Sequence, residues 1–197
     1  TYSASIIFMI NIAIFASGSG SNAQNIITFF KNDSTINIVV MANNSNSYVL
    51  KRAESLNVST IVFDKKQLLS KDGVIKTLQE LNIDFIVLAG FLWKLPGIII
   101  NHFKKKIVNI HPALLPKYGG KGMYGMFVHN SVVQNKEKES GITIHYVNEN
   151  YDEGGIIFQA KVEVESTDTP EDVALKIHAL EMKHFPVVIK NLVNEND

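Results

Sequence analysis

Short apolar runs alternate with amphipathic stretches through the first half of the chain, and this alternation constrains the fold more than any other feature. The runs predict β-strands at 6–16, 36–41, 59–63, 83–89 and 106–110, and the stretches between them predict helices at 22–30, 47–56, 68–81 and 96–103. Parallel strands need long crossover connections, and helices usually supply them. The pattern therefore predicts an α/β fold with a three-layer, Rossmann-like, mostly parallel sheet.

The pattern changes after His111. Residues 112–125 contain two prolines and four glycines without periodicity, which predicts a long loop, and long loops in compact domains are usually functional. A helix at 126–134, strands at 141–147 and 155–164, and a final helix from about Pro170 are expected to follow. Because only a short turn joins the last two strands, they are expected to end the sheet as an antiparallel pair.

Composition limits the classes of partner. No linker or repeat divides the 197 residues, so we expect one domain over 1–197, with residues 1–8 as a candidate upstream extension before Met9. Basic and acidic residues balance at 19 each, which argues against a nucleic-acid partner. The absence of cysteine excludes thiolate metal sites and cysteine nucleophiles. No apolar run reaches the ~20 residues of a membrane helix, and the first basic residue is Lys31, so we expect a cytoplasmic protein.

A glycine-rich loop follows the first predicted strand and leads into a helix. It contains Gly18, Ser19, Gly20, Ser21 and Asn22. Free backbone N–H groups and the positive helix end make such a loop an anion site. The spacing satisfies a dinucleotide fingerprint, but no acidic residue ends the second strand to hold a ribose. A phosphate monoester such as a sugar phosphate is therefore preferred over NAD, and a tight turn without a ligand is the alternative.

Asn109 and His111 end the fifth predicted strand. Successive side chains of a strand point to opposite faces, so Asn109 and His111, two residues apart, lie on the same face. Both then point into the crevice where open α/β sheets bind ligands. Asparagine can donate to a developing oxyanion, and histidine can supply a proton or a positive charge. The alternative is a structural hydrogen bond at the strand end. Four other histidines show no metal-ligand spacing and are interpreted as surface or packing residues: His102, His129, His145 and His184. Trp93 is either core or pocket wall.

Four segments together resemble the phosphoribosylglycinamide formyltransferases, a folate-dependent family of purine synthesis. They are residues 15–22, 87–91, 109–118 and 152–157, in the order and spacing of that family and covering nearly the whole chain from Met9. The resemblance implies transfer of a formyl group from 10-formyltetrahydrofolate to glycinamide ribonucleotide, without a metal, by a monomer or homodimer.

The resemblance also implies roles for single residues. Asn109 would bind the formyl oxygen, His111 would donate a proton, and Asp152 would keep that histidine protonated and order a water. The glycine loop from Gly18 to Asn22 would hold the phosphate, and the final helix would close the site through His178 and Glu181, with Glu181 receiving the amine. The implied folate contacts are Leu92, Trp93, Lys94, Leu95, Asn109, Asn148, Glu149, Asn150, Tyr151 and Asp152.

Two departures from the family pattern concern the folate side. Residues 91–94 are Phe-Leu-Trp-Lys where the commonest form has Phe-Met-Arg, and the loop after Tyr118 lacks a histidine that is often present. Three alternatives stay open. The first is a formyltetrahydrofolate deformylase, which is expected to have an additional N-terminal domain. The second is a methionyl-tRNA formyltransferase, which is expected to have an additional C-terminal domain. The third is a non-catalytic sugar-phosphate or nucleotide-binding module, which would not need Asn109, His111 and Asp152.

Overall fold

The computed structural model describes residues 9–195, so the candidate extension at 1–8 lies outside the described residues. The elements follow one another in the order β1 (Ile10–Ala16), α1 (Ser21–Phe30), β2 (Ile36–Ala42), α2 (Tyr48–Ser55), β3 (Ser59–Val62), α3 (Lys65–Leu69), α4 (Val74–Glu80), β4 (Phe85–Leu88), α5 (Gly97–His102), β5 (Ile107–His111), α6 (Met126–Gln134), β6 (Glu139–Tyr146), β7 (Ile156–Glu163) and α7 (Pro170–Glu195).

The strands form one sheet in the order β3-β2-β1-β4-β5-β6-β7. The first five are mutually parallel, whereas β6 runs antiparallel to both β5 and β7. This confirms the predicted α/β class, the mostly parallel sheet and its antiparallel end. From β1 the chain proceeds outward to β2 and β3 and then returns to β4 on the other side of β1, so the strand order switches between the neighbours β1 and β4. Open α/β sheets bind ligands at such switch points, at the carboxyl ends of their strands.

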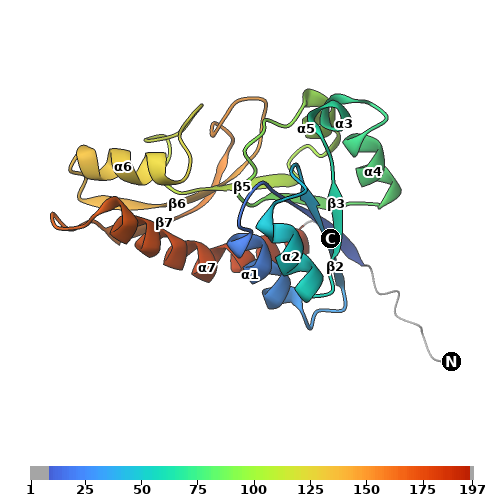
Figure 1. Cartoon of the computed structure of the whole chain (residues 1–197), viewed down its shortest axis with the longest axis horizontal. Helices are drawn as coiled ribbons and strands as arrows, with labels where there is room; N and C mark the ends of the chain where they lie inside the picture. Colours follow the sequence, from blue (N-terminus) through green and yellow to red (C-terminus); the bar gives the residue numbers. More distant parts are fainter. Residues whose placement is uncertain (1–8, 196–197) are drawn as a thin grey trace.

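Two apolar cores cover the two faces of the sheet. One joins α1, α2, α6 and α7 to the sheet, and the other joins α3, α4 and α5 to the opposite face. In β1 the side chains of Ile12 and Ile14 enter the first core, and those of Ala13 and Phe15 enter the second, because successive strand residues point to opposite faces. Figure 1 shows α1 and α2 on the side of the sheet away from α3, α4 and α5.

The predicted single helix at 68–81 is wrong, because the chain forms α3 and α4 there. Asp64 and Gln67 make a reciprocal capping box that starts α3 earlier than predicted. A Cβ atom on Gly73 would lie 2.0 Å from the carbonyl oxygen of Gln67, so the chain turns back tightly against α3. Leu68 and Leu78 still enter one core, which explains why the apolar spacing concealed the break.

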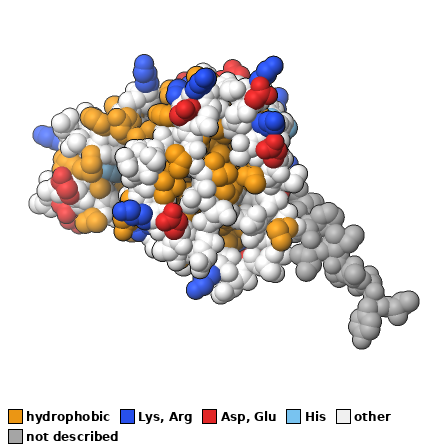
Figure 2. Space-filling view, turned by 45° about the vertical axis from the view of Figure 1, so that its right-hand side comes forward, with side chains coloured by type: hydrophobic (Ala, Val, Ile, Leu, Met, Phe, Trp, Pro, Cys, Tyr) orange, Lys and Arg blue, Asp and Glu red, His pale blue; other side chains and the backbone are white. Residues whose placement is uncertain are grey.

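The other predicted elements are confirmed within the described residues, with ends that differ by a few residues, and the predicted start of the first strand at residues 6–8 lies outside the described residues. No helix or strand forms between β5 and α6 in the described chain, so the glycine-rich segment after His111 is the predicted loop. On the face shown in Figure 2, charged side chains of both signs are interspersed. Among the described helices, including the 26-residue α7, none combines the length and the apolar character needed to cross a bilayer.

Candidate active site

A cavity of about 1070 Å³ opens at the carboxyl ends of β1, β4 and β5. Nearly all the site residues expected from the sequence line it: Gly18, Ser19, Gly20, Ser21, Asn22, Leu92, Trp93, Lys94, Leu95, Asn109, His111, Asn148, Asn150, Tyr151, Asp152, His178 and Glu181. Glu149 is the exception. It does not line the cavity, and a Cβ atom on Gly97 would lie 3.4 Å from its Oε1, so we leave Glu149 out of the proposed site.

Asn109, His111 and Asp152 meet at one end of this cavity. His111 is buried at the end of β5. Its Nδ1 lies 3.5 Å from Asp152 Oδ2, and its Nε2 lies 2.7 Å from the carbonyl oxygen of Tyr118. A carbonyl oxygen only accepts, so Nε2 carries a proton. Because a carboxylate faces the other ring nitrogen, the geometry favours a proton on both nitrogens.

Burial works against that charge. It lowers the pKa of His111, and the Asp152 carboxylate and the Tyr118 carbonyl offset part of the effect. Burial alone would raise the pKa of Asp152, but contact with His145, the charge of His111 and the Gly120 N–H outweigh it, so the pKa lies below its ordinary value. Asp152 is therefore ionised at neutral pH, while His111 without substrate is poised toward its neutral form.

His145 belongs to this cluster, and its interpretation as a surface or packing residue missed that role. It pairs with Asn109 across β5 and β6 and is 2% exposed. Its Nδ1 lies 2.9 Å from the Tyr146 carbonyl oxygen, and its Nε2 lies 3.1 Å from Asn109 Nδ2. Nε2 also lies 3.6 Å from Asp152 Oδ1. His145 thus orients Asn109 and leaves its second amide hydrogen for a ligand.

The turn between β6 and β7 places Asp152 in a left-handed conformation, with φ of 56°. Its Oδ2 accepts the Gly120 N–H at 2.9 Å, which ties this turn to the glycine-rich loop. Nearby, a Cβ atom on Gly154 would lie 1.6 Å from the Tyr146 carbonyl oxygen, so only glycine fits there. Asp152 therefore does more than bond its own turn, whereas Asn148, Asn150 and Glu153 make local bonds within it.

The segment after His111 is held by a buried network. The Thr143 hydroxyl donates to the Ala113 carbonyl at 2.7 Å and accepts the Leu115 N–H at 3.0 Å. The side chain of Gln159 on β7 donates to the Leu115 carbonyl at 3.1 Å. These bonds fix the backbone that leads to Tyr118, whose carbonyl oxygen contacts His111.

The loop from Gly18 to Asn22 also lines the cavity. Within the described chain, no acceptor pairs with the backbone N–H groups of these five residues. Consecutive free N–H groups at a helix start form a concave anion site. Gly20 has φ of 76°, and a Cβ atom there would lie 2.4 Å from the Val49 side chain. Gly20 therefore packs against α2, and its missing Cβ does not face the cavity.

Gly18 offers the cleaner substitution in this loop. A Cβ atom on Gly18 would meet nothing within 4 Å, so Gly18→Ala is expected to fold normally. The added methyl is expected to crowd an anion at the loop and to raise the KM of a phosphorylated substrate about tenfold, equivalent to about 1.4 kcal/mol. Steady-state kinetics and melting temperatures measure both effects.

Gly20→Val, by contrast, should lower the melting temperature, and an unchanged melting temperature there would contradict the packing against Val49.

The helix α7 lines the cavity beside this loop. The Asn22 side chain donates to Glu181 Oε2 at 3.0 Å, and His178 Nδ1 lies 3.5 Å from the same oxygen. Burial raises the pKa of Glu181, although Asn22 and His178 oppose the shift. Such a carboxyl group is suited to receive an amine, because a nearby N–H donor or ammonium replaces the water it has lost.

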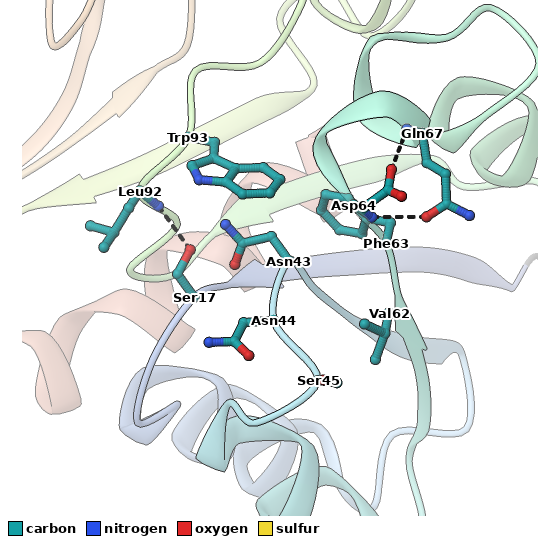
Figure 3. A pocket seen from close by; sticks show the side chains of 10 residues that line it. All are labelled: Ser17, Asn43, Asn44, Ser45, Val62, Phe63, Asp64, Gln67, Leu92 and Trp93. Atoms are coloured by element: carbon teal, nitrogen blue, oxygen red, sulfur yellow. Dashed lines mark hydrogen bonds between the residues drawn. The ribbon is translucent and has the colours of Figure 1, made fainter.

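A second cavity of about 600 Å³ lies beside the first, at the carboxyl ends of β2 and β3. Figure 3 shows its lining, which includes Asn43, Phe63 and Trp93. The Leu92 N–H donates to the Ser17 hydroxyl at 3.0 Å, and Ser17, Leu92 and Trp93 all line this cavity. Leu92 and Trp93 also line the larger one. Trp93 is therefore a pocket wall, which the sequence could not decide.

His129, also interpreted as a surface or packing residue, lines the larger cavity and is 5% exposed, with no partner for its Nδ1 in the described residues. Burial lowers the pKa of His129, and the charge of His111 lowers it further. The unfolded chain therefore takes up a proton near pH 6.5 that the folded chain resists. Stability is fully present above about pH 6.5 and is lost as the pH falls below it, by up to about 1.4 kcal/mol per proton and pH unit.

We therefore expect the His129→Asn variant, which does not titrate, to lose less unfolding free energy between pH 7.5 and 5.5 than the unsubstituted protein. Urea unfolding at the two pH values measures this difference. An identical pH dependence in both proteins would show that His129 does not resist protonation.

No group of three or more histidine or carboxylate side chains among the described residues is arranged to hold a metal ion. The cavity instead combines an anion loop, a buried carboxylate on α7 and an Asn-His-Asp cluster. These groups can hold an anion and an amine while they stabilise negative charge that develops on an oxygen between them.

The chain is similar in sequence and in structure to known proteins. A family model described as Formyl transferase matches residues 10–189. The phosphoribosylglycinamide formyltransferase of Bacillus subtilis (strain 168) is 33% identical over 195 residues, which cover 96% of this chain and 97% of that protein. A crystal structure of phosphoribosylglycinamide formyltransferase from Anaplasma phagocytophilum has a TM-score of 0.85 and 32% identity, covering 95% of this chain and 88% of that chain.

The chloroplastic phosphoribosylglycinamide formyltransferase of Arabidopsis thaliana is 36% identical over 192 residues, which cover 93% of this chain. The chain spans only 65% of that plant protein, in contrast to nearly all of the Bacillus protein.

Proposed function

The chain belongs to the formyl transferase family, and we propose that it transfers the formyl group of 10-formyltetrahydrofolate to the amine of 5'-phosphoribosylglycinamide as a single formyltransferase domain. The products are 5'-phosphoribosyl-N-formylglycinamide and tetrahydrofolate. The observation that carries this proposal is one cavity holding both the anion loop and the Asn109, His111 and Asp152 cluster.

The residues that line the cavity fit the two substrates. The free N–H groups from Gly18 to Asn22 suit the phosphate of the ribonucleotide, and Glu181 on α7 suits its amine. We propose that the folate lies against two lining segments: Leu92 to Leu95, and Asn148 with Asn150 to Asp152. Their apolar and aromatic side chains suit contact with a ring system, and their polar side chains can fix its orientation.

The reaction that we propose needs no covalent enzyme intermediate. The amine nitrogen forms a bond to the formyl carbon, the carbonyl oxygen becomes an oxyanion, and the bond from that carbon to the folate nitrogen then breaks. Asn109 donates its free amide hydrogen to the oxyanion, and protonated His111 supplies positive charge beside it. The attacking amine loses one proton and the leaving nitrogen gains one, so the transfer consumes no proton overall.

The developing charge also resolves the opposing effects on His111. Burial disfavours the imidazolium in the protein alone, but an oxyanion next to it favours the charged ring. We therefore propose that His111 becomes fully protonated as the tetrahedral intermediate forms, with the Asp152 carboxylate as its permanent partner.

A formyl-transfer assay with three acceptors tests the proposed function. Purified protein and 10-formyltetrahydrofolate are mixed with glycinamide ribonucleotide, with charged methionyl-tRNA, or with water alone, and tetrahydrofolate release and the formylated product are quantified. Turnover only with the ribonucleotide is expected. Turnover with water alone would identify a deformylase, turnover with the tRNA would identify the tRNA enzyme, and binding without any turnover would identify a non-catalytic module.

A further inference from the structure

Residues of α2 and the residue before it hydrogen-bond to backbone carbonyl groups at the start of the anion loop (residues 18–22), and we call these bonds the fastening of the loop. The Ser47 hydroxyl donates to the Ser17 carbonyl at 3.0 Å, and the Val49 N–H donates to the Gly18 carbonyl at 3.2 Å. Arg52 Nε donates to the Ser19 carbonyl at 2.8 Å. Three consecutive loop carbonyls are therefore drawn to one side, toward α2.

These bonds determine where the loop amides point. In a trans peptide the C=O and the following N–H point in opposite directions. Carbonyls drawn toward α2 at Ser17, Gly18 and Ser19 thus turn the N–H groups of Gly18, Ser19 and Gly20 away from α2. All three of these residues line the cavity. The fastening keeps carbonyl oxygens, which repel anions, out of the anion site and keeps N–H donors in it.

Two of the fastening side chains depart from their usual use. Ser47 occupies the N-cap position of α2, where serine normally accepts a helix N–H, but it makes no such cap bond and donates to the loop instead. Arg52 is the only arginine in the chain. Its Nη1 also contacts Gln24 Oε1 on α1, and its guanidinium lies 4.9 Å over the Tyr48 ring. No carboxylate pairs with it in the described residues.

We propose that Arg52 is a positioning residue for the phosphate of the substrate, which it does not touch, and that Ser47 assists it. Arg52 does not line the cavity, so it acts through the Ser19 carbonyl and through the span from α2 to α1. This inference rests on the proposed function for the identity of the substrate, but the fastening itself concerns any phosphate bound by the loop.

The test compares Arg52→Gln with Lys51→Gln, which removes the same charge from the neighbouring exposed residue of α2. Arg52→Gln is expected to raise the KM for glycinamide ribonucleotide and the dissociation constant of inorganic phosphate, measured by isothermal titration calorimetry, about tenfold, with kcat and the folate KM within twofold. Lys51→Gln is expected to change none of these. With glycinamide riboside, which lacks the phosphate, Arg52→Gln and the unsubstituted protein should have equal kcat/KM.

Arg52→Lys separates fastening from charge. Lysine keeps the charge but lacks the planar fork that bridges two acceptors, so only partial recovery is expected. Complete recovery, together with loss of the Arg52→Gln defect at high salt, would overturn the inference in favour of simple charge attraction. An equal fall in kcat/KM with and without the phosphate would overturn it in favour of a general structural role.

Ser47→Ala provides a second variant if Arg52→Gln does not fold. It removes a hydrogen bond to the loop without removing a helix cap, and it should also weaken the binding of inorganic phosphate. An unchanged phosphate affinity in folded Ser47→Ala would contradict the assisting role. Failure of the unsubstituted protein to formylate the ribonucleotide would refute the proposed function alone, because the phosphate measurements need no turnover.

Discussion

Replacement of His111 by alanine is expected to lower the kcat of formyl transfer by about 10² to 10³, the usual effect of losing a group that stabilises an oxyanion. His111 is 3% exposed and lies 3.5 Å from the Asp152 carboxylate, so no solvent molecule replaces its charge in the same geometry. Steady-state kinetics with both substrates measure the effect, and KM values should change far less than kcat.

The exposed His102 on α5 provides the matched control, because His102→Ala removes a histidine outside the cavity and should leave kcat unchanged. Asn109→Ala should fall in the same range as His111→Ala. The double variant should lose less than the product of the two single losses, since both groups act on one charge. Retention of a tenth or more of kcat by folded His111→Ala would show that this histidine only makes a structural bond at the strand end.

The sheet and the principal site residues could be predicted because they depend on local patterns. The alternation of apolar runs and helices fixed the strands, and the alternation within β5 placed Asn109 and His111 on one face. The Gly18 to Asn22 loop was recognisable because a glycine turn before a helix has few other uses. Asp152 was different: its turn alone indicated only local bonds, and the resemblance to a family was needed to single it out.

What could not be predicted depends on contacts between distant segments. His145 reaches Asn109 through the register of β5 and β6, which the intervening loop sets and no local pattern encodes. The glycine loop was expected to hold a phosphate, but the missing Cβ of Gly20 accommodates Val49, a residue on another helix. The break between α3 and α4 was hidden because both helices bury the same apolar face. In each example the local rule was satisfied by two arrangements, and tertiary packing selected one.

Asp152→Asn is expected to lower kcat by about 10² or more while KM values for both substrates stay within a few fold. Asparagine tolerates the left-handed backbone at this position better than alanine does, and its side-chain oxygen can still accept the Gly120 N–H. The substitution therefore removes mainly the negative charge beside His111. Glu149→Gln, in the same turn but outside the cavity, removes an equal charge and should leave kcat unchanged.

The pH dependence of kcat distinguishes an electrostatic role from a structural one. If His111 must be protonated in the reacting complex, kcat falls as the pH rises through the pKa of that histidine. The Asp152 carboxylate raises the pKa of His111 against the opposing effect of burial, so Asp152→Asn should move this fall to lower pH. A folded Asp152→Asn variant with unchanged kcat and an unshifted profile would mean that Asp152 serves only to hold Gly120, and that the positive charge on His111 does not depend on its carboxylate.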